Sequence, residues 1–141
     1  MSQLLIDRII DHEGCSRFVY KDSLGYETIG IGRNVDPRSQ RGLTLDEQIY
    51  LLNNDLQLCI GQLIHLPIYI MLDPVRQEVL VELTFNMGIT RLLGFKNMLA
   101  AIHDKDFEKA VVELKDSLWA KQVQPSRVDD ICYRLSKGEY Q

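Results

Sequence analysis

Three residues near the N-terminus, Glu13, Asp22 and Thr28, have side chains suited to acid–base chemistry. Eight residues separate the two acids, so a chain reversal between them can bring both carboxyl groups to one place. A protonated carboxyl can donate to a leaving oxygen, and an ionised one can activate a water. Two carboxyl groups on either side of an exposed strand are a pair of groups that can cleave a glycosidic bond. The Thr28 hydroxyl can hold a water or a sugar.

A helix is predicted to place Glu13. The apolar spacing over residues 3–12 is typical of an amphipathic helix, which Ser2 can cap and Gly14 can end. Glu13 then lies in the last turn, where the negative end of the helix macrodipole favours a protonated carboxyl. An exposed glutamate at a helix end, with no chemical role, is the alternative.

A β-hairpin is predicted to place the other two residues. Residues 18–20 and 27–31 are rich in aromatic and β-branched side chains, and the turn residues 22–25 join them. Taken alone, Asp22 has a structural role, because aspartate bonds its own backbone in turns.

Side-chain alternation in the second strand predicts an open face around Thr28. A period of two puts Tyr26, Thr28, Gly30 and Gly32 on one face, and Ile29 and Ile31 on the other. We expect the isoleucine face to be packed. The glycines leave the Thr28 face nearly bare, so that a ligand can approach the backbone there.

The sequence from residue 44 onward predicts helices. Thr44 and Glu47 fit a capping box, and apolar residues recur at helical intervals as far as Leu63. Asp73 and Pro74 suit the start of another helix. Further helices are predicted over residues 74–87, 95–103, 107–117 and 126–136, the last starting at a capping box formed by Ser126 and Asp129.

These elements predict one domain over residues 1–141, with a mostly helical α+β fold. We expect a small lobe with a β-hairpin or sheet over residues 14–43. A larger helical lobe is expected over residues 1–13 and 64–141. A long helix over residues 44–63 would join the two lobes.

Composition and charge argue against several classes of protein. Hydrophobic residues make up 45% and charged residues 26%, as in an ordinary globular protein. The formal net charge of −4, without a basic helix face, argues against a nucleic-acid partner. Arg33, Arg38 and Arg41 are expected to form a solvated face, and attraction of an anionic polymer is the weaker alternative.

The sequence gives no sign of a metal, a cofactor or a membrane span. His12, His65 and His103 are scattered, so we expect no metal site and no cofactor. Three widely spaced cysteines fit neither a disulfide framework nor a zinc site. Residues 1–10 lack the apolar core of a signal peptide, and no apolar run reaches the roughly 20 residues of a membrane span. We therefore expect no stable membrane insertion.

The N-terminal motifs resemble those of the phage-type, T4-like lysozymes, the muramidase family to which endolysins belong. The resemblance rests on Glu13 between His12 and Gly14, on Asp22 after Tyr20-Lys21, and on the run from Gly25 to Gly32. It continues through later blocks in the family's order, namely Val75-Arg76, Phe85-Asn86-Met87-Gly88, Gly94-Phe95 and Ser117-Leu118-Trp119. It covers most of the chain and implies a lysozyme-like fold.

The resemblance also implies roles for individual residues. Glu13 is the general acid on the leaving oxygen, and Asp22 and Thr28 hold the attacking water on the opposite face of the sugar. The family's C-terminal arginine, which pairs with the catalytic glutamate, corresponds to Arg127. Two acids that follow it, Asp129 and Asp130, can compete for it. The expected substrate-binding residues are Gly30, Asn34, Phe85, Asn86 and Arg127.

The implied activity is hydrolysis of the β-1,4 bond between N-acetylmuramic acid and N-acetylglucosamine in peptidoglycan, causing lysis of a host bacterium. The resemblance implies inversion at the anomeric carbon, which the spacing of Glu13 and Asp22 allows without demanding it. An inactive or regulatory peptidoglycan-binding module on the same fold is the alternative. A lytic transglycosylase also uses a glutamate, but it needs no water-holding aspartate and threonine.

The expected partner is the peptidoglycan polysaccharide, bound by a monomer. The expected location is the cytoplasm of the host bacterium before lysis, and a virion-associated component is the alternative. From the cytoplasm, the enzyme would depend on a holin-like membrane permeabiliser to reach the cell wall.

Overall fold

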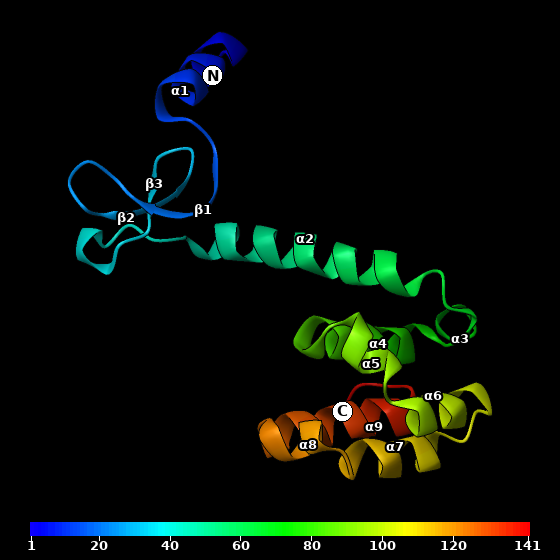
Figure 1. The fold of residues 1–141 in the computed structure, drawn as a ribbon. Helices are drawn as coiled ribbons and strands as arrows, with labels where there is room; N and C mark the ends of the chain where they lie inside the picture. Colours follow the sequence, from blue (N-terminus) through cyan, green and yellow to red (C-terminus); the bar gives the residue numbers. More distant parts are fainter. The chain divides into compact units, whose positions relative to one another are not determined.

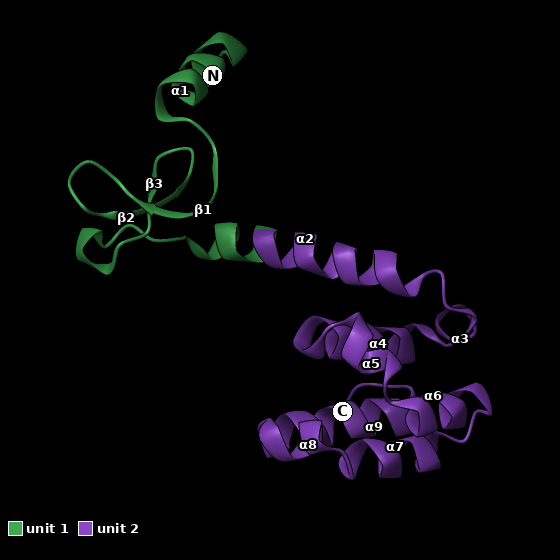
Figure 2. Ribbon diagram, viewed as in Figure 1, with its two compact units in different colours: residues 1–50 green, residues 51–141 purple.

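The computed structural model describes residues 1–141 as two compact units, residues 1–50 and residues 51–141 (Figure 2). The boundary falls within a long helix, α2 (Leu45–Leu63). A small antiparallel sheet lies in unit 1, and the rest of the regular structure is mainly helical, which confirms the predicted α+β class. The assignment of residues 1–13 to the helical lobe stays a prediction.

Unit 1 contains one helix, a three-stranded sheet and a short 3-10 helix before α2 (Figure 1). The strand order is β1-β2-β3, and both pairings are antiparallel. The elements are α1 (Gln3–Glu13), β1 (Ser16–Lys21), β2 (Glu27–Gly30), β3 (Arg33–Asn34) and η1 (Pro37–Ser39).

The ends of α1 are those predicted from its caps. The Ser2 hydroxyl accepts a hydrogen bond from the backbone N–H of Leu5. Gly14 takes a φ of 72°, and its N–H donates to the carbonyl of Ile10. Because only glycine adopts this conformation readily, the helix ends at Glu13. No residue of α1 is buried.

The predicted open face around Thr28 is wrong. Thr28 is only 3% exposed, whereas Ile31 is 43% exposed. The cause is the backbone of Gly30, whose φ of 68° turns the chain out of β2 after four residues. Ile31 therefore lies beyond the strand, and the unpredicted strand β3 pairs Asn34 with Thr28.

Ion pairs hold the segment between β3 and α2. The Arg33 guanidinium bonds both carboxylate oxygens of Glu47 and, at 3.2 Å, the carbonyl of Gly42. Glu47 also accepts from the Thr44 N–H at 2.9 Å, which confirms the predicted capping box. Arg38 pairs with Asp36. Two of the three arginines expected to form a solvated face are thus engaged in ion pairs.

Unit 2 contains the hydrophobic core. Its helices after α2 are α3 (Pro67–Ile70), α4 (Pro74–Met87), α5 (Ile89–Leu93), α6 (Lys96–His103), α7 (Phe107–Lys115), α8 (Leu118–Gln122) and α9 (Pro125–Lys137). Helix α7 packs against α6 and α9, and α9 packs against α4 (Figure 1). The largest fully buried side chains include Trp119, Leu80, Leu83, Ile102, Leu114, Ile131 and Leu135.

The predicted start of the last helix is wrong. Gln124 is the N-cap of α9 and Pro125 takes the first turn, in place of the expected capping box of Ser126 and Asp129. Proline fits that turn because it has no N–H to leave unbonded. The short helices α3, α5 and α8 were not predicted. None of the helices combines the length and apolar character that a membrane span requires.

Glu47 should stabilise the fold in a pH-dependent way. The hydrogen bond from Arg33 lowers the pKa of Glu47 from 4.5 to about 2. Since the folded pKa lies below the unfolded value, the ion pair stabilises the folded chain above pH 4.5 and loses that effect as the pH falls toward 2. Glu47→Gln should therefore lower the thermal midpoint near neutral pH and change it little in strong acid.

Circular dichroism melts over this pH range would measure the difference. Asp46→Asn is the matched control, because it removes a charge from the same helical turn without touching Arg33. Equal midpoints of wild type and Glu47→Gln at neutral pH would contradict the prediction.

Candidate active site

The carboxyl group of Glu13 lies over Gly32. A Cβ atom built on Gly32 would be 2.7 Å from Glu13 Oε2, a distance that real Cβ atoms do not tolerate. Gly32 also has a φ of 68°, which favours glycine independently. The end of α1 and the turn between β2 and β3 are therefore brought together, and the missing side chain of Gly32 makes room for the Glu13 carboxylate.

Asp22 organises the turn between β1 and β2. One carboxylate oxygen, Oδ1, accepts from the backbone N–H of Leu24 at 2.9 Å and of Tyr26 at 2.8 Å. The Asp22 N–H donates to the Tyr26 carbonyl at 2.9 Å. The structural role expected for a turn aspartate is thus present, and it occupies only one of the two carboxylate oxygens.

Thr28 is linked to Asp22 through Tyr26. The Thr28 hydroxyl donates to the Tyr26 carbonyl at 3.1 Å, the same oxygen that accepts from Asp22. Thr28 lies in the central strand, opposite Tyr20 on β1 and Asn34 on β3. Two of the three catalytic candidates, Asp22 and Thr28, are therefore hydrogen-bonded to the backbone of one residue, Tyr26.

This arrangement leaves hydrogen-bond acceptors free. Asp22 Oδ2 accepts no hydrogen bond within the chain. Because the Thr28 hydroxyl uses its proton on Tyr26, its oxygen can still accept from another donor. Asp22 and Thr28 therefore each keep one acceptor that the chain itself does not use.

Two candidate substrate-binding residues lie along the same sheet. The space that a Cβ would take at Gly30 is empty to 4 Å, and the φ of 68° there explains the glycine. Asn34 faces Thr28 across the β2–β3 pairing. The side-chain oxygen Oδ1 of Asn34 accepts from the Asp36 N–H at 3.0 Å. The side-chain NH₂ of Asn34 is therefore the part that a ligand can use.

Phe85 and Arg127, in unit 2, line one hollow of about 430 Å³. Phe85 is 44% exposed, so part of its ring is accessible. The Arg127 guanidinium donates to Glu82 at 3.2 Å. The acids expected to compete for Arg127 do not pair with it: Asp130 bonds Arg134 instead. The pairing of Arg127 with Glu13 stays a prediction.

Asn86 has a structural contact that the sequence did not indicate. Its side-chain oxygen accepts from the indole N–H of the buried Trp119 at 2.7 Å. An indole N–H buried without an acceptor is costly, so this bond fixes the orientation of the amide. The amide NH₂ of Asn86 remains available on the surface.

Two of the contacts made by the candidate residues, one in each unit, involve groups which side-chain patterns do not reveal. The Tyr26 anchor is a backbone group, and Glu82 lies 45 residues from Arg127. The turn motif of Asp22 indicates a bond to the backbone N–H two residues later, at Leu24, and not the bond to Tyr26. No group of three or more His, Cys, Asp or Glu side chains is placed to hold a metal ion.

Comparison with known proteins gives a family and several relatives. The model of the phage lysozyme family matches residues 10–134. The probable T4-type lysozyme 1 of Dictyostelium discoideum is 29% identical, and the match covers 89% of each chain. The probable T4-type lysozyme 2 of the same organism is 26% identical, over 98% of this chain and 96% of that protein. The pre-baseplate central spike protein Gp5 of Enterobacteria phage T4 is 29% identical over 78% of this chain, a match that covers 24% of the spike protein.

Gly32→Ala should displace the Glu13 carboxyl group, because the new methyl carbon would lie 2.7 Å from Oε2. The carbon-13 shift of the Glu13 carboxyl, measured by NMR, should change. Gly42→Ala is the matched control, since Gly42 also has a positive φ of 51° but has no atom within 4 Å of its Cβ position. An unchanged Glu13 resonance in Gly32→Ala would show that the two groups do not meet.

Proposed function

Because the chain belongs to the phage lysozyme family, we propose that it is a muramidase, a glycoside hydrolase acting on bacterial peptidoglycan. The bond cleaved is the β-1,4 linkage between N-acetylmuramic acid and N-acetylglucosamine. The observation that carries the proposal is the anchoring of Asp22 and Thr28 on the backbone of Tyr26, which leaves one acceptor free on each side chain. The names of the Dictyostelium relatives, both probable T4-type lysozymes, agree with it.

Glu13 acts as the general acid and donates a proton to the leaving glycosidic oxygen. Its position at the end of α1 keeps the carboxyl exposed, so a polysaccharide can approach it. The absence of a side chain at Gly32 leaves room for that carboxyl. Protonation of a leaving oxygen by a positioned acid contributes about 10²–10⁴-fold to the rate.

Asp22 and Thr28 hold and activate the attacking water. The ionised Asp22 accepts one proton of the water through Oδ2, and the Thr28 oxygen accepts a hydrogen bond from the other. Thr28 is 3% exposed, so its side chain is closed to a sugar ring. A water held in this way attacks from the face opposite the leaving group, and the reaction inverts the anomeric carbon.

The remaining candidates contact the glycan. Gly30 offers open backbone, and Asn34 and Asn86 each offer a free amide NH₂. The exposed ring of Phe85 offers an apolar surface to a sugar face. Arg127 has its guanidinium oriented by Glu82 and is a further donor at the hollow that Phe85 also lines.

The biological role that we propose is lysis of a host bacterium by a monomer bound to peptidoglycan. The enzyme acts from the host cytoplasm with the help of a holin-like permeabiliser. A virion-associated role is the alternative, and the match to part of a phage T4 spike protein favours it. Nucleic acid is not proposed as a partner, since Arg33 and Arg38 are engaged in ion pairs with carboxylates.

Glu13→Gln tests the proposal. The glutamine cannot donate a carboxyl proton, so clearing of purified peptidoglycan should fall at least about 100-fold. Asp11→Asn is the matched control, because Asp11 is an exposed acid of the same helix, α1, and its side chain makes no ion pair. Equal clearing by Glu13→Gln and wild type would remove Glu13 from the mechanism. Binding without clearing by wild type would show an inactive peptidoglycan-binding module.

Thr28 should matter through its hydroxyl group alone. Thr28→Val keeps the shape of the side chain and removes the hydroxyl, whereas Thr28→Ser keeps it. We expect turnover to fall at least about 10-fold in the valine variant and to be largely retained in the serine variant. In Thr28→Val, the free energy of unfolding should fall by about 1 kcal/mol, the contribution of the one hydrogen bond that is lost. Equal turnover in the two variants would make Thr28 only a strand residue.

A further inference from the structure

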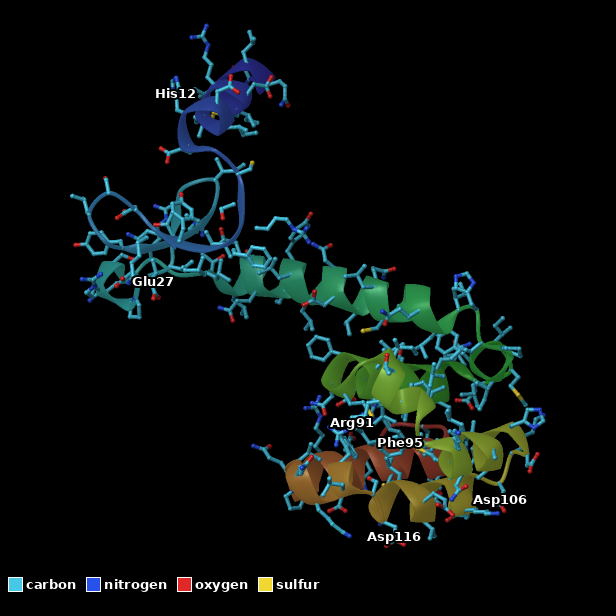
Figure 3. The ribbon with its side chains drawn as sticks, viewed as in Figure 1. His12, Glu27, Arg91, Phe95, Asp106 and Asp116 are labelled. Atoms are coloured by element: carbon cyan, nitrogen blue, oxygen red, sulfur yellow. The ribbon has the colours of Figure 1, made fainter.

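The loop that follows β3 holds the strand segment on which the catalytic candidates are anchored. The backbone N–H groups of Val35 and Asp36 donate to the Glu27 carbonyl at 2.8 Å and 3.1 Å. In return, the Glu27 N–H donates to the Asp36 carboxylate at 3.2 Å. Glu27, labelled in Figure 3, is the first residue of β2 and lies between Tyr26 and Thr28 in the sequence. The loop is therefore fixed to β2 beside the anchor.

Asp36 is a buried acid with an arginine partner. It is 5% exposed, and its carboxylate accepts from Arg38 Nε and Arg38 Nη2, each at 2.8 Å. It also accepts from the Arg38 backbone N–H at 2.9 Å. The hydrogen bonds from Arg38 hold the pKa of Asp36 far below its usual range. The carboxylate is thus charged whenever the protein is folded at ordinary pH, and it holds the guanidinium in one orientation.

Arg38 reaches from this carboxylate to the Asp22 turn. Its Nη2 donates to the carbonyl of Gly25 at 3.0 Å. Its guanidinium carbon lies 4.7 Å from the centre of the Tyr26 ring, a cation–π distance. Although 63% of the Arg38 side chain is exposed, its two bonds to the buried Asp36 carboxylate fix the guanidinium. The contacts with Gly25 and Tyr26 then hold these two residues in place.

We propose that Arg38, oriented by Asp36, is a positioning residue for the water-holding pair Asp22 and Thr28. The inference rests on the proposed function. Arg38 and Asp36 together contact three consecutive residues, Gly25, Tyr26 and Glu27. The middle residue, Tyr26, is the one to which both Asp22 and Thr28 are hydrogen-bonded. Without these contacts, the peptide groups on either side of Tyr26 move, and the distance between the acceptor oxygens of Asp22 and Thr28 changes.

The geometry requires arginine in particular. One guanidinium makes two bonds to Asp36, a third bond to Gly25, and a cation–π contact with the Tyr26 ring. A lysine ammonium is a point charge without this fork or plane. Arg38→Lys therefore keeps the positive charge of the loop but loses the combined contacts with Asp36, Gly25 and Tyr26. This variant separates positioning from simple electrostatic attraction of the substrate.

The kinetic test uses Arg38→Ala and Arg38→Lys in the full chain, with a soluble peptidoglycan oligosaccharide as substrate. Misplacement of the water-holding pair should lower kcat about tenfold in both variants and leave KM within about twofold. Arg41→Ala is the matched control, since Arg41 lies in the same loop and its side chain makes no ion pair. A kcat equal to that of Arg41→Ala, or a higher KM with kcat retained, would overturn the inference.

Amide hydrogen exchange supplies a readout that needs no activity. In Arg38→Ala, the Tyr26 and Glu27 N–H groups should exchange at least about tenfold faster than in wild type and in Arg41→Ala. Unchanged exchange at both amides would overturn the inference by itself. Failure of wild type to hydrolyse the oligosaccharide would instead show that the proposed function is wrong, so the two failures are distinguishable.

Discussion

The peptide groups on either side of Tyr26 carry the hydrogen bonds on which the arrangement of the candidate site depends. The Tyr26 N–H donates to Asp22, and the Tyr26 carbonyl accepts from the Asp22 N–H and the Thr28 hydroxyl. A turn aspartate and a strand threonine therefore keep a fixed relation to one another. The sheet supplies the rigidity, because β1 and β3 pair with β2 on both sides of Thr28.

The structural role of Asp22 and the chemical role that we propose for it do not compete, because they use different oxygens. Oδ1 closes the turn, and Oδ2 stays free. Glu13 arrives from a separate element, and the constraint on it is the absence of a side chain at Gly32. Asp22 and Thr28 are thus placed by backbone groups, and the loop that binds the backbone beside Tyr26 acts on both of them.

Local sequence predicted the features that local contacts determine. The ends of α1, the Thr44 capping box of α2 and the turn at Asp22 each depend on residues a few positions apart. The strand β3 could not be predicted, because its two polar residues carry no alternating pattern. The burial of Thr28, which pairs with this strand, could not be predicted for the same reason. The partner of Arg127 could not be predicted, since Glu82 is distant in sequence and reaches it only through the packing of α4 against α9.

The first anomer formed tests most directly whether Asp22 and Thr28 hold a water. An NMR time course on a soluble β-linked peptidoglycan fragment distinguishes the possible products. A water attacking opposite the leaving group gives the α-anomer first, and this is the result we predict. A β-anomer formed first, with an ester trapped on Asp22, would make Asp22 a nucleophile and contradict the account. An anhydro product would contradict it as well, since no water would have been added.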